Sequence, residues 1–235
     1  ANSLENAQLI SSPGIFKILV LLFGQEKGIQ AGEYIFTKPE SVYNIMRRLT
    51  SGDHQISPLK ITIPEGANVY ETAEIFSKKL SKFNKDDFLA EAKEGYMFPD
   101  TYFFLPNVTT DGVFLAMQEN FKQKTQMLED KINGFGKSFE EIITVASIIE
   151  EEARTEESRR IISDIIWKRL EIGMPLQVDV TFQYVNGKNS YELTLDDLEA
   201  ESPYNTYKYA GLPPTPISNP GLDSIEAAIT PTSTD

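Results

Sequence analysis

Residues 146–153 carry the side chains best suited to acid–base chemistry. They read Ala-Ser-Ile-Ile-Glu-Glu-Glu-Ala. On a helix at about 100° per residue, Glu150 shares a face with the two alanines, whereas Glu151 and Glu152 point elsewhere. The alanines leave room for a ligand, and apolar neighbours disfavour the charged form of a carboxyl. A protonated glutamic acid can give its proton to a glycosidic leaving group, so Glu150 is the candidate acid. Spacing alone favours a simpler alternative, an acidic helix face with three solvated glutamates.

A second set of candidates lies in the loop-rich segments that follow, and its members are Gln177, Asp179, Tyr204, Asn205 and Thr206. Amide, carboxyl, phenol and hydroxyl groups donate and accept hydrogen bonds, as sugar recognition requires, and a tyrosine ring adds a stacking face. Pro and Gly in the same segments mark turns, where Asn and Thr often bond to the local backbone. From the residues alone a purely structural role is the simpler interpretation.

Composition narrows the chemistry to carboxylates, Lys, Tyr, Ser and Thr. The 235 residues include no cysteine and one histidine, His54. Thiol nucleophiles, zinc–thiolate sites and two-histidine metal motifs are therefore excluded, and a Ser-His-Asp triad would have to run through His54. We expect neither a metal nor a cofactor. The net charge of −13 argues against nucleic acid as a partner and against adhesion to an anionic membrane surface.

Capping signals predict the helices that would position Glu150. Ser138 followed by Glu141 is a capping-box arrangement, which predicts a helix that runs to about Ala153. Thr155 predicts the start of another helix, which continues to about Glu171.

The first part of the chain has the pattern of a small α+β unit. The apolar run 15–23 is too short to span a membrane, for which roughly 20 residues are needed, and it contains a lysine, so a buried strand or core helix is expected. Alternation predicts strands at 28–36 and 59–63, and helical periodicity predicts helices at 39–49 and 69–80. We place a domain boundary just before the aromatic-rich segment that begins at Glu94.

Four ordered blocks together resemble the endolytic murein transglycosylase family, also called YceG-like. The blocks are 94–102 (Glu-Gly-Tyr-Met-Phe-Pro-Asp-Thr-Tyr), 146–150 (Ala-Ser-Ile-Ile-Glu), 173–181 (Gly-Met-Pro-Leu-Gln-Val-Asp-Val-Thr) and 203–221, which contains Pro-Tyr-Asn-Thr-Tyr, Gly-Leu-Pro-Pro and Asn-Pro-Gly. Earlier pieces, at 31–34, 41–52 and 61–66, look like the family's LysM-like subdomain. The chain departs from the family pattern at Val178, Val180 and Thr215.

The resemblance implies a fold of the α+β class. A small LysM-like N-terminal α/β subdomain would be followed by a mixed helical and loop-rich catalytic domain. The corresponding domains are 1–93, which also contains the linking α+β part, and 94–235, with the catalytic domain ending short of the family's last strands. The resemblance implies a location at the extracytoplasmic face of the bacterial cell membrane, and the family's N-terminal membrane helix is not in the sequence.

The resemblance also implies a lytic transglycosylase that cleaves the bond between N-acetylmuramic acid and N-acetylglucosamine and leaves 1,6-anhydromuramyl ends. Glu150 matches the family's catalytic glutamate, and Gln177, Asp179, Tyr204, Asn205 and Thr206 are the candidates for binding glycan or supporting Glu150. Glycan strands of peptidoglycan are the expected partner, together with proteins of cell-wall synthesis.

Three alternatives remain open at this point. One is a non-catalytic peptidoglycan-binding module, and a second is a hydrolytic muramidase that uses Asp179 as its second carboxylate. The third is a structural domain with no ligand. We expect Glu94 and Asp100, in the aromatic block, to be structural.

Overall fold

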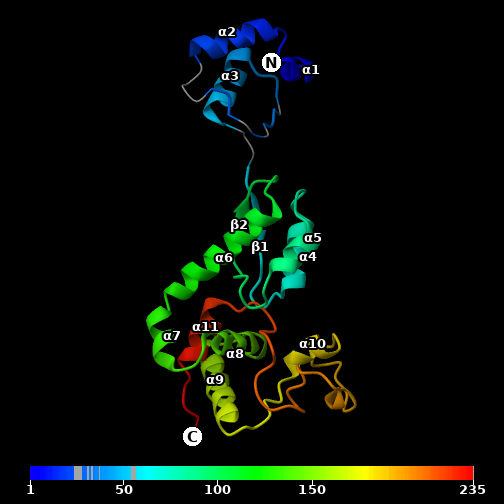
Figure 1. The fold of residues 1–235 in the computed structure, drawn as a ribbon, viewed down its shortest axis with the longest axis vertical. Helices are drawn as coiled ribbons and strands as arrows, with labels where there is room; N and C mark the ends of the chain where they lie inside the picture. The colour runs from blue at the N-terminus through cyan, green and yellow to red at the C-terminus, as the bar shows by residue number, and fades with distance from the viewer. Residues whose placement is uncertain (24–27, 31, 33, 37, 54–56, 235) are drawn as a thin grey trace. The chain divides into compact units, whose positions relative to one another are not determined.

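The computed structural model describes residues 1–23, 28–30, 32, 34–36, 38–53 and 57–234 (Figure 1). Contacts divide the chain into two compact units, Ala1–Pro58 and Leu59–Asp235. The boundary expected before Glu94 lies inside the second unit, and the division of the chain by function stays a prediction. The α+β class is confirmed, because the described residues form helices and one two-stranded sheet.

The first unit consists of three helices, α1 (Asn2–Asn6), α2 (Pro13–Phe23) and α3 (Val42–Ser51). Ser41 caps α3, because its side chain accepts a hydrogen bond from the backbone N–H of Asn44 at 3.2 Å. Apolar side chains from α2, α3 and the segment before α2 form the core of the unit, and they are Ile10, Phe16, Ile45, Met46 and Leu49.

The structure decides between the two expectations for the run 15–23 and corrects the expected strand at 28–36. The run is a helix, part of α2, and not a strand, but only one side of it belongs to the core, since Phe16 is buried while Leu21 is 83% exposed. The apolar run therefore belongs to a helix that the rest of the first unit covers on one side only. The segment 28–36 has no regular structure in its described residues, so the predicted strand is wrong there. Ala31, Glu33 and His54 lie outside the described residues, and no described helix is long and apolar enough to cross a membrane.

The second unit begins with the two-stranded sheet and three helices. Strand β1 (Leu59–Thr62) pairs antiparallel with β2 (Thr101–Phe104), and Ile61 lies opposite Tyr102. The helices are α4 (Val69–Ser77), α5 (Lys85–Glu91) and α6 (Thr110–Gln126). Alternate side chains of both strands point into one core with α4, α5 and α6, as the period of a strand requires.

The rest of the second unit is a helical cluster followed by loops. Its helices are α7 (Glu129–Phe135), α8 (Phe139–Glu152), α9 (Glu156–Glu171), α10 (Phe182–Val185) and α11 (Leu222–Ile229), with single 3-10 turns η1 (Asp179–Thr181) and η2 (Asp197–Glu199). Helix α8 packs against α9 and α11 (Figure 1). Every residue from Ile142 to Ile149 is buried, which explains why this stretch is apolar nearly all round.

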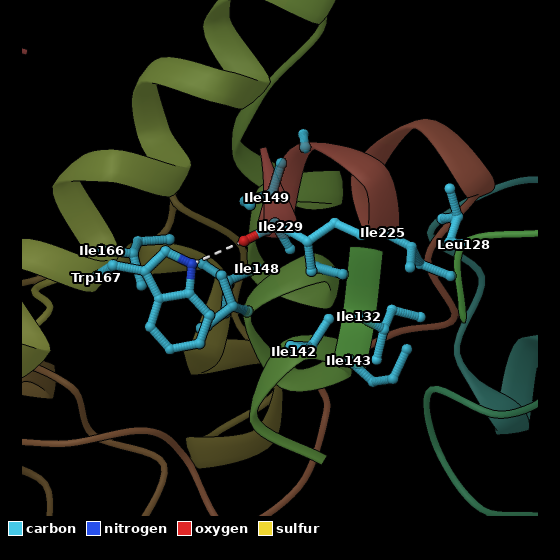
Figure 2. Packing of buried hydrophobic residues seen from close by; sticks show 14 of the residues in the cluster. Leu128, Ile132, Ile142, Ile143, Ile148, Ile149, Ile166, Trp167, Ile225 and Ile229 are labelled. Atoms are coloured by element: carbon cyan, nitrogen blue, oxygen red, sulfur yellow. Dashed lines mark hydrogen bonds between the residues drawn. The ribbon is translucent and has the colours of Figure 1, made fainter. Parts of the chain in front are cut away.

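Figure 2 shows the packing that holds α8. Isoleucines of α8 meet Ile225 and Ile229 of α11 and Trp167 of α9. The indole N–H of Trp167 donates to the backbone oxygen of Ala228 at 2.8 Å, which satisfies a polar atom inside the cluster. Both predicted capping signals are confirmed, since Ser138 with Glu141 and Thr155 with Ser158 form capping boxes.

Removing the cap of α8 should destabilise the second unit. The hydroxyl of Ser138 accepts from the backbone N–H of Glu141 at 3.2 Å, so Ser138→Ala leaves that donor without its partner. We expect a loss of about 1 kcal/mol in the free energy of unfolding, measured by urea denaturation. Ser138→Asp, which keeps an N-cap acceptor, is the control and should stay near the unmutated value. Equal losses in both variants would mean that the cap contributes nothing.

Candidate active site

The three glutamates at the end of α8 lie in three different surroundings. Glu150 accepts a hydrogen bond from the backbone N–H of Gly221 at 2.9 Å through Oε2. Its Oε1 lies 3.6 Å from a guanidinium nitrogen of Arg159 on α9, and its side chain is only 7% exposed. Glu151 and Glu152 are exposed on other sides of the helix. The expected divergence of the three side chains is confirmed, and Glu150 is not a solvated surface acid.

Arg159 is the cation of this region. Besides Glu150 it approaches Asp223 at 3.9 Å, and the Asp223 side chain is 72% exposed. The Nε–H of Arg159 is buried and has no hydrogen-bond partner among the described residues. The guanidinium therefore acts mainly as a positive charge between carboxylates, because its N–H groups are not all hydrogen-bonded.

Burial raises the pKa values of both neighbouring glutamates. For Glu151, desolvation is the largest cause and a hydrogen bond with Ser218 partly offsets it. For Glu152, desolvation is again the largest cause, the charge of Asp179 adds to it, and the backbone of Val180 opposes it. Both residues remain exposed to water, and Glu151 also lines two cavities beside the helix.

A groove lies beside the end of α8. It consists of two cavities, of about 720 and about 320 Å³, that share Gly66, Glu71 and Glu151. The larger cavity extends past Tyr70, and the smaller past the almost fully exposed Tyr191. Gly66 has φ +80°, and a Cβ there would lie 2.6 Å from Oε1 of Glu151, so only glycine fits between the turn and the glutamate.

The buried amide of Asn219 joins three segments around this site. Its Oδ1 accepts from the backbone N–H groups of Gly95 at 2.9 Å and Met97 at 3.0 Å. Its Nδ2 donates to the backbone oxygen of Ala67 at 2.8 Å and to the carboxylate of Glu94 at 2.9 Å. A primary amide makes four hydrogen bonds of this kind at most, so the side chain is fully used.

Glu94 stands at the next position in this network. Its carboxylate accepts from the backbone N–H of Val69 at 3.1 Å and from the hydroxyl of Tyr184. Burial raises the pKa of Glu94 to about 7, and the hydrogen bonds with Tyr184 and Val69 limit the rise. Tyr184 stacks on Tyr204, with ring centroids 5.1 Å apart. Glu94 thus connects the turn before α4 to the loops around α10, in line with a structural role.

The loop residues predicted to bind glycan divide into two groups. Asn205 and Thr206 are 0% and 2% exposed. The amide of Asn205 donates to the backbone oxygens of Leu198 and Ala200, and the Thr206 hydroxyl donates to that of Val178. These two side chains hold the loop together from inside.

The other three lie closer to the surface. Gln177 has φ 53° and donates its backbone N–H to Thr206, which fixes the loop beneath it. Asp179 accepts from the hydroxyl of Tyr207 at 2.5 Å, and it interacts with Glu152 through charge. The hydroxyl of Tyr204 lies 2.8 Å from that of Thr215.

The structure adds residues that the sequence did not single out. Glu65 lies against Gly221 and interacts electrostatically with both Glu150 and Arg159. Asn219 and Gly221 belong to an Asn-Pro-Gly block that was visible in the sequence, and Glu65 to the segment 61–66 that resembles part of the LysM-like subdomain. The signal was present in each case, but nothing in the spacing showed that these distant segments meet at the end of α8.

Comparison with known proteins gives a consistent result. The YceG-like family matches the chain over residues 1–235. A Bacillus subtilis protein named endolytic murein transglycosylase is 35% identical, and the match covers 100% of this chain and 73% of that protein. A Streptococcus pneumoniae R6 protein of the same name is 27% identical over 99% of this chain and 50% of its own length. The crystal structure of a yceG-like protein from Listeria monocytogenes has a TM-score of 0.69 and 30% identity, and covers 99% of this chain and 86% of that one.

The Asn219 network predicts a large loss of stability on truncation. Asn219→Ala removes four hydrogen bonds and leaves the buried N–H groups of Gly95 and Met97 without partners. We expect the free energy of unfolding to fall by about 3 kcal/mol or more, measured by urea denaturation. Asn133→Ala, at an exposed position of α7, is the control and should change it by less than about 0.5 kcal/mol. A similar small change in both variants would refute the network's importance.

The pKa of Glu94 predicts that stability falls as the pH rises. The carboxyl titrates near 4.5 when unfolded and near 7 when folded, so the folded state binds the proton more tightly. Its contribution is fully present below about pH 4.5 and is lost as the pH rises through about 7. Glu94→Gln should remove this slope, worth roughly 3 kcal/mol. Free energies of unfolding measured across this range would contradict the assignment if the two proteins gave parallel curves.

Proposed function

We propose, because this chain belongs to the YceG-like family, that it is an endolytic murein transglycosylase whose single catalytic acid and base is Glu150. The bond cleaved is the glycosidic bond between N-acetylmuramic acid and N-acetylglucosamine in peptidoglycan. One observation carries the residue assignment. Of the three glutamates at the end of α8, Glu150 alone meets both a backbone N–H, from Gly221, and a guanidinium, from Arg159, among the described residues.

The reaction needs one carboxyl in two successive roles. Protonated Glu150 gives its proton to the glycosidic oxygen, the bond from that oxygen to C1 of the muramyl residue breaks, and an oxocarbenium-like centre forms. The carboxylate then takes the proton of the muramyl 6-hydroxyl, whose oxygen attacks C1. The product is a 1,6-anhydromuramyl end, and Glu150 is protonated again. No water is activated, so the second carboxylate of most glycosidases is not required.

The neighbours of Glu150 suit the ionised state between the two steps. The N–H of Gly221 and the guanidinium of Arg159 both stabilise a carboxylate, and they are in place before the reaction. Groups that are already oriented toward a developing charge cost no reorganisation when the charge appears. Loss of either neighbour should therefore slow the first step more than it weakens glycan binding.

The groove at Gly66 and Glu151 is the proposed path of the glycan strand. Tyr70 and Tyr191 line its two parts and provide exposed rings for stacking on sugars. Gln177, Asp179 and Tyr204 are proposed to contact the glycan or support Glu150, and buried Asn205 and Thr206 to shape the loop that presents them. The catalytic part is proposed to occupy 94–235.

The remaining assignments extend the proposal to the whole protein. The first unit is proposed to be the LysM-like subdomain, and the protein to act at the extracytoplasmic face of the membrane together with cell-wall synthesis proteins. The chain spans about half the length of the streptococcal relatives.

Two alternative functions, a muramidase and a peptidoglycan-binding module, would give a different product or no product. A muramidase would use a second carboxylate and leave reducing ends. Asp179, the residue expected for that role, bonds to Tyr207 and interacts with Glu152, which does not favour it as the partner of Glu150. A binding module would retain peptidoglycan without cleaving it.

Replacing Glu150 tests the proposal directly. Peptidoglycan is digested with the unmutated chain and with Glu150→Gln, and the released fragments are identified by mass spectrometry. We expect anhydro-ended fragments from the unmutated chain and a loss of at least about 100-fold in the variant, because the acid–base group is gone. Glu140→Gln, an exposed glutamate at the start of the same helix, is the control and should remain active.

Each other outcome has one meaning. Hydrated reducing ends identify a muramidase. Equal activity in the unmutated chain and Glu150→Gln sinks the assignment of Glu150. Absence of cleavage with glycan binding intact points to a binding module.

A further inference from the structure

A second carboxylate, Glu65, lies beside Glu150. It comes from the turn after β1, which is far from α8 in the sequence and outside the predicted catalytic region. The turn is held in place by two backbone hydrogen bonds, from Gly66 to Asn219 at 3.0 Å and from Asn219 to Ala67 at 3.3 Å. Glu65 also lines the larger cavity of the groove. Its position is therefore fixed by the backbone rather than by a flexible loop.

Glu65 and Glu150 contact the same residue. A Cβ added to Gly221 would lie 2.1 Å from Oε1 of Glu65, so this carboxylate occupies the space that any side chain at position 221 would need. The backbone N–H of the same glycine donates to Glu150. Gly221 has φ −73°, a conformation open to every residue, so the close approach of Glu65, and not backbone geometry, explains why glycine suits this position.

The local charges are not balanced. Glu65, Glu150 and Asp223 all interact with the single cation Arg159. Glu65 and Asp223 are exposed, and Glu151 also interacts with Glu150 through charge. Burial raises the pKa of Glu65, the charges of Glu150 and Asp223 raise it further, and Arg159 lowers it. Several carboxylates are therefore arranged around the guanidinium of Arg159.

We propose that Glu65 is a positioning residue for the reaction, which places a second negative charge beside Glu150 across Gly221. This inference rests on the function proposed above. When Glu150 has given its proton to the glycosidic oxygen, two carboxylates lie around Arg159, which offsets one charge. The muramyl 6-hydroxyl then returns a proton to Glu150, which restores the starting state. Glu65 touches neither of the reacting atoms and acts through the charge it places beside Glu150.

The pH dependence of cleavage tests this role. The rate of anhydro-ended product formation from peptidoglycan is measured across the pH range for the unmutated chain and for Glu65→Gln. Glu65→Gln removes a negative charge from the site of the reaction, so the alkaline limb of the profile should move to lower pH by at least about half a unit. On that limb the rate should fall about threefold or more at a fixed pH.

Three further variants separate charge from structure. Glu74→Gln removes the same charge from the same cavity, where Glu74 pairs with Lys85 rather than with Arg159, and it should not move the limb. Glu65→Asp keeps the charge and should restore most of the limb position. Gly221→Ala keeps every charge but displaces the Glu65 carboxylate, so it should shift the limb in the same direction as Glu65→Gln. Melting temperatures confirm that each variant is folded.

The failures of the two proposals can be told apart. In one outcome the unmutated chain is active, and the alkaline limb of its pH profile lies at the same pH as in Glu65→Gln and Gly221→Ala. That result overturns the role of Glu65 alone. A shift of equal size in Glu74→Gln also overturns it, because the effect would then be general to the cavity. An unmutated chain that makes no anhydro ends overturns the function and this inference with it. If Glu65→Gln does not fold, Gly221→Ala decides the question.

Discussion

The site depends on one buried amide, that of Asn219. A polar side chain inside a protein is favourable only when all its hydrogen bonds are made, and here all four connect different segments. They fix the turn that carries Glu65, the strand-leading segment at Glu94 and the start of α11. Helix α8 supplies Glu150 but none of its neighbours. The amide therefore helps to hold the turn of Glu65 and the segment before α11 beside the glutamate, while Arg159 comes from α9, which packs on α8.

The end of α8 shows how one helix turn produces three kinds of carboxyl. Successive residues differ in direction by about 100°, so adjacent glutamates meet different partners. Glu150 faces a backbone N–H and a guanidinium, Glu151 faces the groove and Ser218, and Glu152 faces Asp179. The helix can support this because its preceding residues are buried and hold it in one rotation. Identical side chains thus take different roles through position alone.

Local signals in the sequence predicted local structure well. The capping box at Ser138, the Thr155 cap and the alternating strand at β1 are formed by residues within a few positions of one another. The run 15–23 was ambiguous because apolar residues alone do not distinguish a strand from a helix.

Long-range features were not predictable from one chain. Asn205 and Thr206 look like ligand contacts in the sequence, yet both turn inward to the backbone of their own loop. Glu65 gave no sign of its neighbour because turn, helix and loop are distant in sequence. The same local pattern fits many packings, and only tertiary contacts choose among them.

The distance in sequence between Glu65 and Gly221 also has a consequence for biosynthesis. Contacts between residues far apart in the chain close late, after the loop between them has been ordered. A nascent chain that ends before Asn219 contains Glu150 but lacks the amide and the glycine that complete its surroundings. An incomplete polypeptide would therefore carry the acid without the assembled site. Assembly of the site around Glu150 is in this way tied to completion of the second unit.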